Sequence, residues 1–72
     1  SNAAVPGDGV RRVTIKELET ALADKSALVV DVRDETSYKN GHIKGALSIP
    51  LADLPNRLSD LPKDKLIVFY CA

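Results

Sequence analysis

The sequence predicts one small α/β domain: a parallel sheet with helices on both of its faces. Strand-like and helix-like segments alternate from residue 10 to the end of the 72-residue chain, and only short connections separate them. Two uninterrupted apolar runs, at residues 27–30 and 66–70, are typical of strands that are covered on both faces. A chain of this length makes at most one domain.

The first nine residues are expected to lie outside the fold. Residues 1–3 (SNA) have the composition of a scar that remains after a purification tag is cleaved. Residues 4–9 contain one proline and two glycines, a mixture typical of a flexible leader. We therefore expect the domain to cover residues 10–72.

A short strand at residues 10–13 and an amphipathic helix are the first expected elements. Thr14 and Glu17 have the spacing of a capping box, in which each side chain accepts a hydrogen bond from the other residue's backbone N–H. Apolar residues then recur at spacings of three and four as far as about Ala23; these are Ile15, Leu18 and Leu22.

The apolar run at residues 27–30 is the second expected strand. Asp34 is placed to cap a short helix after it, and Gly41 is placed to end that helix in a left-handed conformation. Residues 46–49 are expected to form a brief strand that Pro50 ends.

The last two expected elements are a helix capped by Asp53 and a strand at residues 66–70. Pro55 is tolerated in the first turn of a helix, and a leucine series is expected to face the core. Its members are Leu54, Leu58 and Leu61. The strand is expected to be fully buried and to end at Cys71.

Composition excludes several classes of function. Lysine plus arginine and aspartate plus glutamate number ten each, for a net charge of zero, which argues against a nucleic-acid partner or a polybasic membrane patch. The longest apolar run, at residues 66–72, is far shorter than the ~20 residues of a membrane helix. The single cysteine cannot form a disulfide within the chain, and no cysteine–histidine cluster has the spacing of a zinc site.

Cys71 is the candidate nucleophile. A lone cysteine is often just a small buried apolar residue, but this one follows directly after a predicted parallel strand. Ligands of open parallel sheets bind beyond the carboxyl ends of the strands. The turn and helix N-terminus expected there in such a sheet would stabilise a thiolate.

The segment at residues 29–50, VVDVRDETSYKNGHIKGALSIP, resembles the amino-terminal signature of rhodanese-like domains. In that family an apolar strand ends in Asp-x-Arg, an aromatic residue precedes Gly-His-Ile-x-Gly-Ala, and Ile-Pro follows. A helix and an apolar strand that ends in the active cysteine come next, and Leu66–Tyr70 with Cys71 reproduce them. The resemblance covers about residues 10–72.

The resemblance implies a sulfurtransferase. In the family, a cysteine thiolate takes the outer sulfur of a donor such as thiosulfate, becomes a persulfide, and passes that sulfur to cyanide or a thiol. Cys71 would carry the sulfur, with no metal or organic cofactor, and small-molecule donors and acceptors would be the partners. The family holds the persulfide in a cradle of N–H groups in the loop after the cysteine.

The family fold also implies that part of the domain is missing from this chain. Its five-stranded parallel sheet has the order 1-5-4-2-3, and the sequence supplies candidates for strands 1 to 4 only. We expect the carboxy-terminal remainder to lie on another chain or to have been cleaved off, and we expect this fragment alone to be inactive.

Four other residues are expected to support the site structurally: Asp31, Arg33, His42 and Gly45. Asp31 and Arg33 are expected to pair with each other or with Glu35. His42 is interpreted as part of a structural turn rather than as the base of a cysteine–histidine pair, and Gly45 as a source of backbone freedom there. We expect Tyr38 to anchor the core with its hydroxyl hydrogen-bonded.

Two alternatives remain open at the level of sequence. The first is a non-catalytic rhodanese-like module that binds a partner or senses redox state. The second is a cysteine-dependent phosphatase or arsenate reductase of a related fold, whose longer loop ends in a phosphate-binding arginine. The chain is expected to be soluble, in the cytoplasm or the periplasm; its sequence does not select between these compartments.

Overall fold

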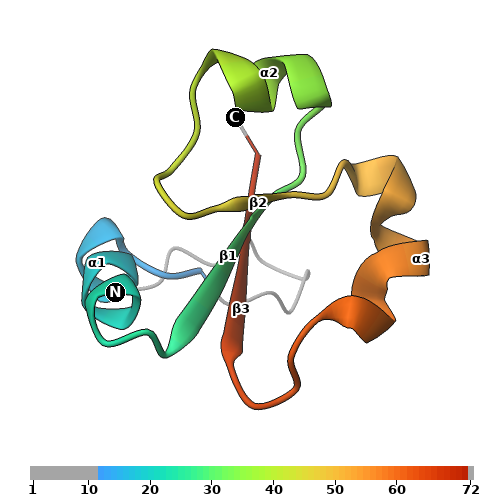
Figure 1. Cartoon of the computed structure of the whole chain (residues 1–72). Helices are drawn as coiled ribbons and strands as arrows, with labels where there is room; N and C mark the ends of the chain where they lie inside the picture. The colour runs from blue at the N-terminus through green and yellow to red at the C-terminus, as the bar shows by residue number, and fades with distance from the viewer. Residues whose placement is uncertain (1–11, 72) are drawn as a thin grey trace.

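A three-stranded parallel sheet forms the centre of the protein (Figure 1). The computed structural model describes residues 12–71. The strands β1 (Ala27–Asp31), β2 (Leu47–Ser48) and β3 (Leu66–Tyr70) lie in the order β2-β1-β3, and β1 pairs in parallel with both neighbours. The predicted parallel sheet is confirmed, and these strands occupy the order expected for strands 3, 2 and 4 of the rhodanese-like sheet.

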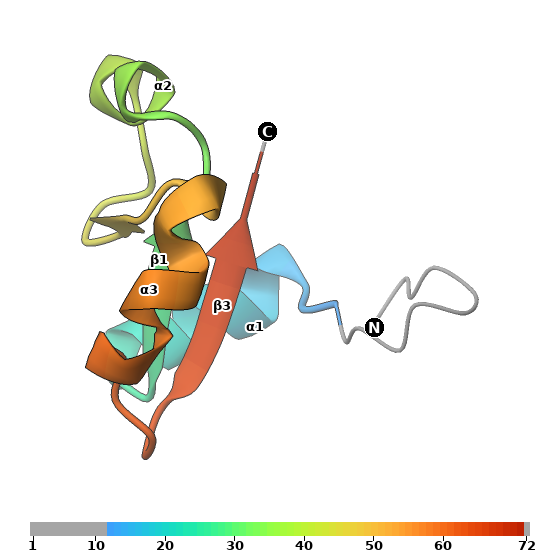
Figure 2. The same ribbon diagram turned by 90° about the vertical axis from the view of Figure 1, so that its right-hand side faces the viewer.

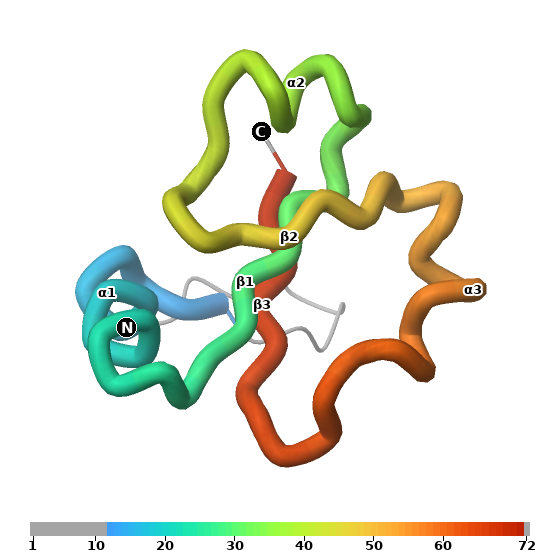
Figure 3. The backbone as a smooth tube through the Cα atoms, in the orientation of Figure 1, coloured from blue at the N-terminus to red at the C-terminus, as the bar shows by residue number. Residues whose placement is uncertain are grey.

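Helices cover both faces of the sheet. The helix α1 (Ile15–Ala23) lies on one face, and α3 (Leu54–Arg57) lies on the other (Figure 2). The short helix α2 (Glu35–Asn40) lies beyond the carboxyl ends of the strands, as the Cα trace also shows (Figure 3). The predicted α/β/α arrangement is therefore confirmed.

The boundaries of α1 follow from its sequence. The Thr14 N–H donates to the Glu17 carboxylate at 2.8 Å and the Glu17 N–H donates to the Thr14 hydroxyl at 3.0 Å, so the predicted capping box is present. At the other end Lys25 has a left-handed backbone, with φ of 62°. The Ser26 N–H then donates to the Ala21 carbonyl at 2.9 Å, which completes a Schellman motif and ends the helix.

The core lies between the sheet and α3. Val30 of the central strand is fully buried against Ile49 and Leu61. Partly buried apolar side chains surround this cluster: Leu28, Val32, Leu54 and Ile67. The core therefore holds the central strand in place by packing as well as by hydrogen bonding to both neighbours.

The expected strand at residues 10–13 is not found where it can be examined. Residues 10 and 11 lie outside the described residues, and Arg12 and Val13 are not in a strand. Arg12 and Val13 line one wall of a groove whose other wall is β3.

The expected burial of β3 is also wrong for this chain. Leu66 is 44% exposed and Phe69 is 43% exposed. Among the described residues β3 pairs only with β1, so its other edge faces the groove.

The third helix differs from its prediction in two respects. Asp53 makes no side-chain capping bond, because it lies in a 3-10 turn (Leu51–Asp53) and lacks the extended backbone that a cap needs. Leu58, which begins a second 3-10 turn (Leu58–Asp60), is 51% exposed, so it does not face the core as expected.

Candidate active site

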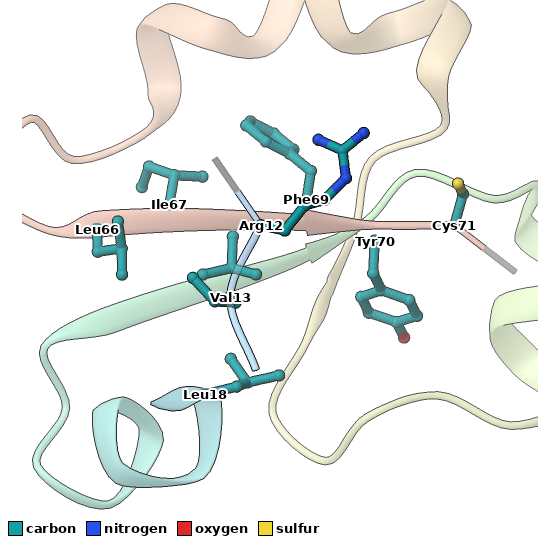
Figure 4. Close-up of a pocket in the computed structure, with 9 residues that line it drawn as sticks. Arg12, Val13, Leu18, Leu66, Ile67, Phe69, Tyr70 and Cys71 are labelled. Atoms are coloured by element: carbon teal, nitrogen blue, oxygen red, sulfur yellow. The ribbon is translucent and has the colours of Figure 1, made fainter. Parts of the chain in front are cut away.

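Cys71 lies one residue beyond β3, at the carboxyl end of the sheet, and is exposed. It lines one end of a groove of about 610 Å³ that follows the whole of β3. The other wall of the groove comes from Arg12, Val13 and Leu18. Figure 4 shows Phe69 and Cys71 on one side of the strand and Tyr70 on the other. The thiol is therefore accessible from solvent and from the groove.

Asp31 and Arg33, at the end of the central strand, form an ion pair. The Arg33 Nη2 and the Asp31 Oδ2 are 2.7 Å apart, and the Arg33 Nε donates to both carboxylate oxygens at 3.0 and 3.1 Å. The Arg33 backbone N–H adds a further bond to Oδ1 at 2.9 Å. The pair expected from the sequence is present, with Arg33 rather than Glu35 as the described partner; its role in supporting the site stays a prediction.

Burial makes this ion pair unusual. Asp31 is 0% exposed, and a buried carboxylate needs compensating hydrogen bonds to stay charged. The bonds from Arg33 hold the pKa of Asp31 far below its usual range, although burial acts in the opposite direction. The same bonds raise the pKa of Arg33 further above its already high value. The pair therefore stays ionised at neutral pH.

Arg33 also connects β1 to two other segments. Its Nη2 donates to the Gly41 carbonyl, at the end of α2, at 2.6 Å. The guanidinium carbon lies 5.5 Å from the centre of the Tyr70 ring, within the range of a cation–π contact. Arg33 thus contacts the last residue of the strand that precedes Cys71.

Tyr38 and His42 fix the loop that follows α2. The Tyr38 hydroxyl donates to the Ala46 carbonyl at 2.7 Å, so the predicted anchor with a bonded hydroxyl is present. The His42 ring is stacked on the Tyr38 ring, with centroids 3.7 Å apart. The His42 Nδ1–H donates to the Tyr38 carbonyl at 2.7 Å. Both contacts join His42 to Tyr38 of α2. They agree with the structural role expected of His42, which stays a prediction.

Gly45 sits at the sharp turn of this loop. Its φ is 86°, which residues with a Cβ seldom adopt. The Ala46 N–H donates across the turn to the Ile43 carbonyl at 2.9 Å, which places Gly45 at the position of a type II turn that favours glycine. The expected need for backbone freedom at Gly45 is confirmed. Gly41 has a φ of 153° and a ψ of 128°, so it does not adopt the left-handed helical conformation expected of it.

Sequence reasoning did not identify Tyr70 as part of the site. Its hydroxyl accepts a hydrogen bond from the Ile43 backbone N–H at 3.1 Å, in addition to the contact of its ring with Arg33. The available signal was a tyrosine at the end of an apolar strand, because a tyrosine that is partly buried usually has a partner for its hydroxyl. The partner is 27 residues away in the chain, so no local pattern could reveal it.

Residues 12–71 contain neither a candidate metal cluster nor a candidate membrane helix. No group of three or more histidine, cysteine, aspartate or glutamate side chains there could hold a metal ion. No helix in the same range is long and apolar enough to cross a membrane.

Comparison with known proteins adds three relatives. A sulfurtransferase of Allochromatium vinosum is 36% identical over 63 residues, which cover 86% of this chain and 59% of that protein. The HTH-type transcriptional regulator Rv0324 of Mycobacterium tuberculosis is 41% identical over 66 residues, which cover 92% of this chain and 28% of that protein. Among solved structures, the human single-domain sulfurtransferase TSTD1 matches with a TM-score of 0.74 and 32% identity, over 88% of this chain and 68% of that one.

The matched regions cover most of this chain but only part of the curated relatives. The chain spans 28% and 59% of the length of the two curated relatives. The family model for the rhodanese-like domain matches residues 14–72, which include every described element of the fold. The chain belongs to the rhodanese-like domain family.

Proposed function

We propose that the complete domain is a sulfurtransferase and that Cys71 carries the sulfur. The position of the chain's only cysteine carries this proposal: it is exposed at the carboxyl end of a parallel strand, where open sheets bind ligands. The relatives from Allochromatium vinosum and human, both named as sulfurtransferases, support it.

The proposed reaction has two steps that share one nucleophile. The Cys71 thiolate attacks the outer sulfur of thiosulfate, a new S–S bond forms, and sulfite leaves with the electron pair of the bond that breaks. The resulting persulfide anion is then attacked at its terminal sulfur by cyanide or a thiolate. With cyanide the products are thiocyanate and the original thiolate, so charge and atoms balance in both steps.

The residues around Cys71 have supporting roles in this proposal. The Nε and Nη2 groups of Arg33 bond to the Asp31 carboxylate and the Gly41 carbonyl, so we assign Asp31 and Arg33 to holding the strand ends together rather than to the chemistry. His42 bonds to Tyr38 and is assigned to the loop. Gly45 provides the turn.

The test is the replacement of Cys71 by serine in the full-length protein. We expect Cys71→Ser to remove thiocyanate formation from thiosulfate and cyanide while melting temperature and circular dichroism stay unchanged. In the wild type, incubation with thiosulfate alone is expected to add the mass of one sulfur atom to the peptide that contains Cys71. Wild-type turnover in the serine variant would show that Cys71 is not the nucleophile.

We also propose that the remainder of the domain, on the same chain or another, supplies a further strand that pairs with β3. The edge of β3 that has no pairing partner among the described residues, with Leu66 and Phe69 each more than two-fifths exposed, supports this proposal, because an apolar edge invites a pairing partner. The groove along β3 offers the space, and the relatives are longer than the matched region.

The similarity to a transcriptional regulator favours one alternative function. A rhodanese-like module within a larger protein can respond to sulfur species or oxidants through an exposed thiol without turnover. The exposure of Cys71 is compatible with this. A full-length protein that forms the persulfide but transfers no sulfur to cyanide or to thiols would favour the sensing function.

A further inference from the structure

We propose that Tyr70 is a positioning residue that fixes the direction of the Cys71 thiol. This inference rests on the proposed function, because it assigns a role relative to the nucleophile of that reaction. It arises from one observation: Tyr70 is held by contacts from two other segments of the chain, the end of the central strand and the loop after α2, and Cys71 is the next residue.

The backbone of Tyr70 is tied to the central strand. Tyr70 is in register with Asp31, and its carbonyl accepts a hydrogen bond from the Val32 N–H at 3.0 Å. The pairing of β1 with β3 therefore continues to the final residue before Cys71. On its other side β3 borders the groove, so the described backbone pairing of Tyr70 comes from β1.

The side chain of Tyr70 contacts the end of the central strand again, at Arg33, and one further segment. Its hydroxyl accepts from the Ile43 N–H at 3.1 Å, in the loop after α2. Its ring faces the Arg33 guanidinium, whose carbon is 5.5 Å from the ring centre. The ring lies on the opposite side of the strand from the Cys71 side chain (Figure 4), so Tyr70 can hold the strand end without blocking access to the thiol.

The loop that holds the Tyr70 hydroxyl is itself braced. Tyr38 donates to the Ala46 carbonyl at 2.7 Å, and Arg33 donates to the Gly41 carbonyl at 2.6 Å. The Ile43 N–H lies between these two attachment points in the sequence. The bond to Tyr70 therefore connects the strand end to a supported loop and not to a freely moving one.

A small displacement at this position has a large effect on reaction rate. A nucleophile reacts efficiently when it is held about 3–3.5 Å from its target with the correct alignment, and a misplacement of about 1 Å can cost roughly 100-fold. Cys71 lies outside the strand and is exposed. Rotation of the Tyr70 backbone therefore changes the direction of the Cys71 thiol. The contacts of Tyr70 limit that rotation.

The test compares two tyrosine-to-phenylalanine variants of the full-length protein. Tyr70→Phe removes the acceptor for the Ile43 N–H and keeps the ring against Arg33. Tyr38→Phe is the matched control, because it removes a hydroxyl bond to the same loop from the side of α2. Both variants are followed by melting temperature, by donor affinity, and by the single-turnover rate of persulfide formation from thiosulfate.

We expect Tyr70→Phe to lower the rate of persulfide formation about tenfold with donor affinity unchanged. We expect Tyr38→Phe to lower that rate less, because the loop keeps its bond from Arg33 to Gly41. Arg33→Lys, which keeps the charge and loses the planar fork, is expected to lower the rate in the same direction as Tyr70→Phe. Equal rates in Tyr70→Phe, Tyr38→Phe and wild type would overturn the proposal. Retained turnover in Cys71→Ser would instead overturn the proposed function, so the two failures are distinguishable.

Discussion

The side chain of Arg33 reaches the backbone carbonyl of Gly41 at 2.6 Å. This bond joins the segment that leaves the central strand to the residue that ends α2. Arg33 holds the buried Asp31 carboxylate with its other donors, so one guanidinium connects a buried charge with the loop next to the candidate site. Its removal would leave the Gly41 carbonyl without this bond and the Asp31 carboxylate without its counter-charge.

We expect Arg33→Ala in the full-length protein to lower the melting temperature by about 10 °C and to change the Michaelis constant for thiosulfate little. The reason is that the substitution leaves a buried carboxylate without its counter-charge. The control is Arg57→Ala, which breaks the exposed pair of Arg57 with Asp60; exposed pairs contribute little. An unchanged melting temperature with a greatly raised Michaelis constant would place Arg33 in the substrate site.

The ionised state of Asp31 predicts a dependence of stability on pH. Its pKa is lower in the folded protein than its ordinary value, so its contribution is complete above the unfolded pKa, about 3.9. That contribution is lost as the pH falls toward the folded pKa. We therefore expect the difference in melting temperature between wild type and Asp31→Asn to shrink as the pH falls from about 5 to about 2.

Asp53→Asn is the control for this measurement, since the Asp53 side chain makes no capping bond. The difference in melting temperature between Asp53→Asn and wild type is expected to stay small across the same pH range. Two other aspartates, Asp24 and Asp34, also have lowered pKa values. Both are present in every protein compared, so their contributions cancel in the differences in melting temperature. A difference between wild type and Asp31→Asn that does not vary with pH would contradict the assignment.

Elements defined by neighbouring residues could be predicted well from the sequence. The capping box of Thr14 and Glu17 depends on residues three apart, and it appears as expected. The third helix could not be predicted in detail, because its division into 3-10 and α-helical turns depends on packing rather than on the spacing of its leucines. The exposure of Phe69 depends on what lies beside β3, which no property of the strand's own sequence reports.

Lys25 offers a test of the backbone at the end of α1. Its φ of 62° is strained for a residue with a Cβ, so Lys25→Gly is expected to leave stability unchanged or to raise it by up to about 1 kcal/mol. The control is Lys16→Gly, which places the same residue inside α1 and is expected to cost about 0.5–1 kcal/mol. The free energy of unfolding of both variants is measured by denaturant unfolding. A loss of stability in Lys25→Gly comparable to that in Lys16→Gly would contradict the assigned conformation.

The uncovered edge of β3 predicts how the isolated chain behaves. Residues 4–72 produced alone are expected to associate with increasing concentration and to lack thiosulfate turnover, because an exposed apolar edge pairs with other edges. Leu66→Lys is expected to reduce the association, since a charged side chain at an edge opposes it. Addition of the rest of the domain as a second polypeptide is expected to restore turnover to the unsubstituted chain. A monomer with dispersed chemical shifts, a cooperative melt and full activity would contradict the proposal of a further strand.

The candidate site was predictable only in part. Asp31 and Arg33 are two residues apart, so their pairing could be expected from their spacing. The contact of Tyr70 with Ile43 spans 27 residues and depends on β1 and β3 being neighbours in the sheet. Single-sequence reasoning finds the residues of a site that lie close in the chain and misses those that the sheet brings together.

The central position of β1 has a consequence for the order of events in folding. Its pairing with β3 closes a loop from Ala27 to Leu66, and such long-range contacts form slowly. Asp31 finds its counter-charge only two residues away, at Arg33, so the ion pair is available to a nascent chain before β3 has been synthesised. The counter-charge of the carboxylate therefore lies in its own segment, and burial of Asp31 in the closing sheet does not require a charge from the distant strand.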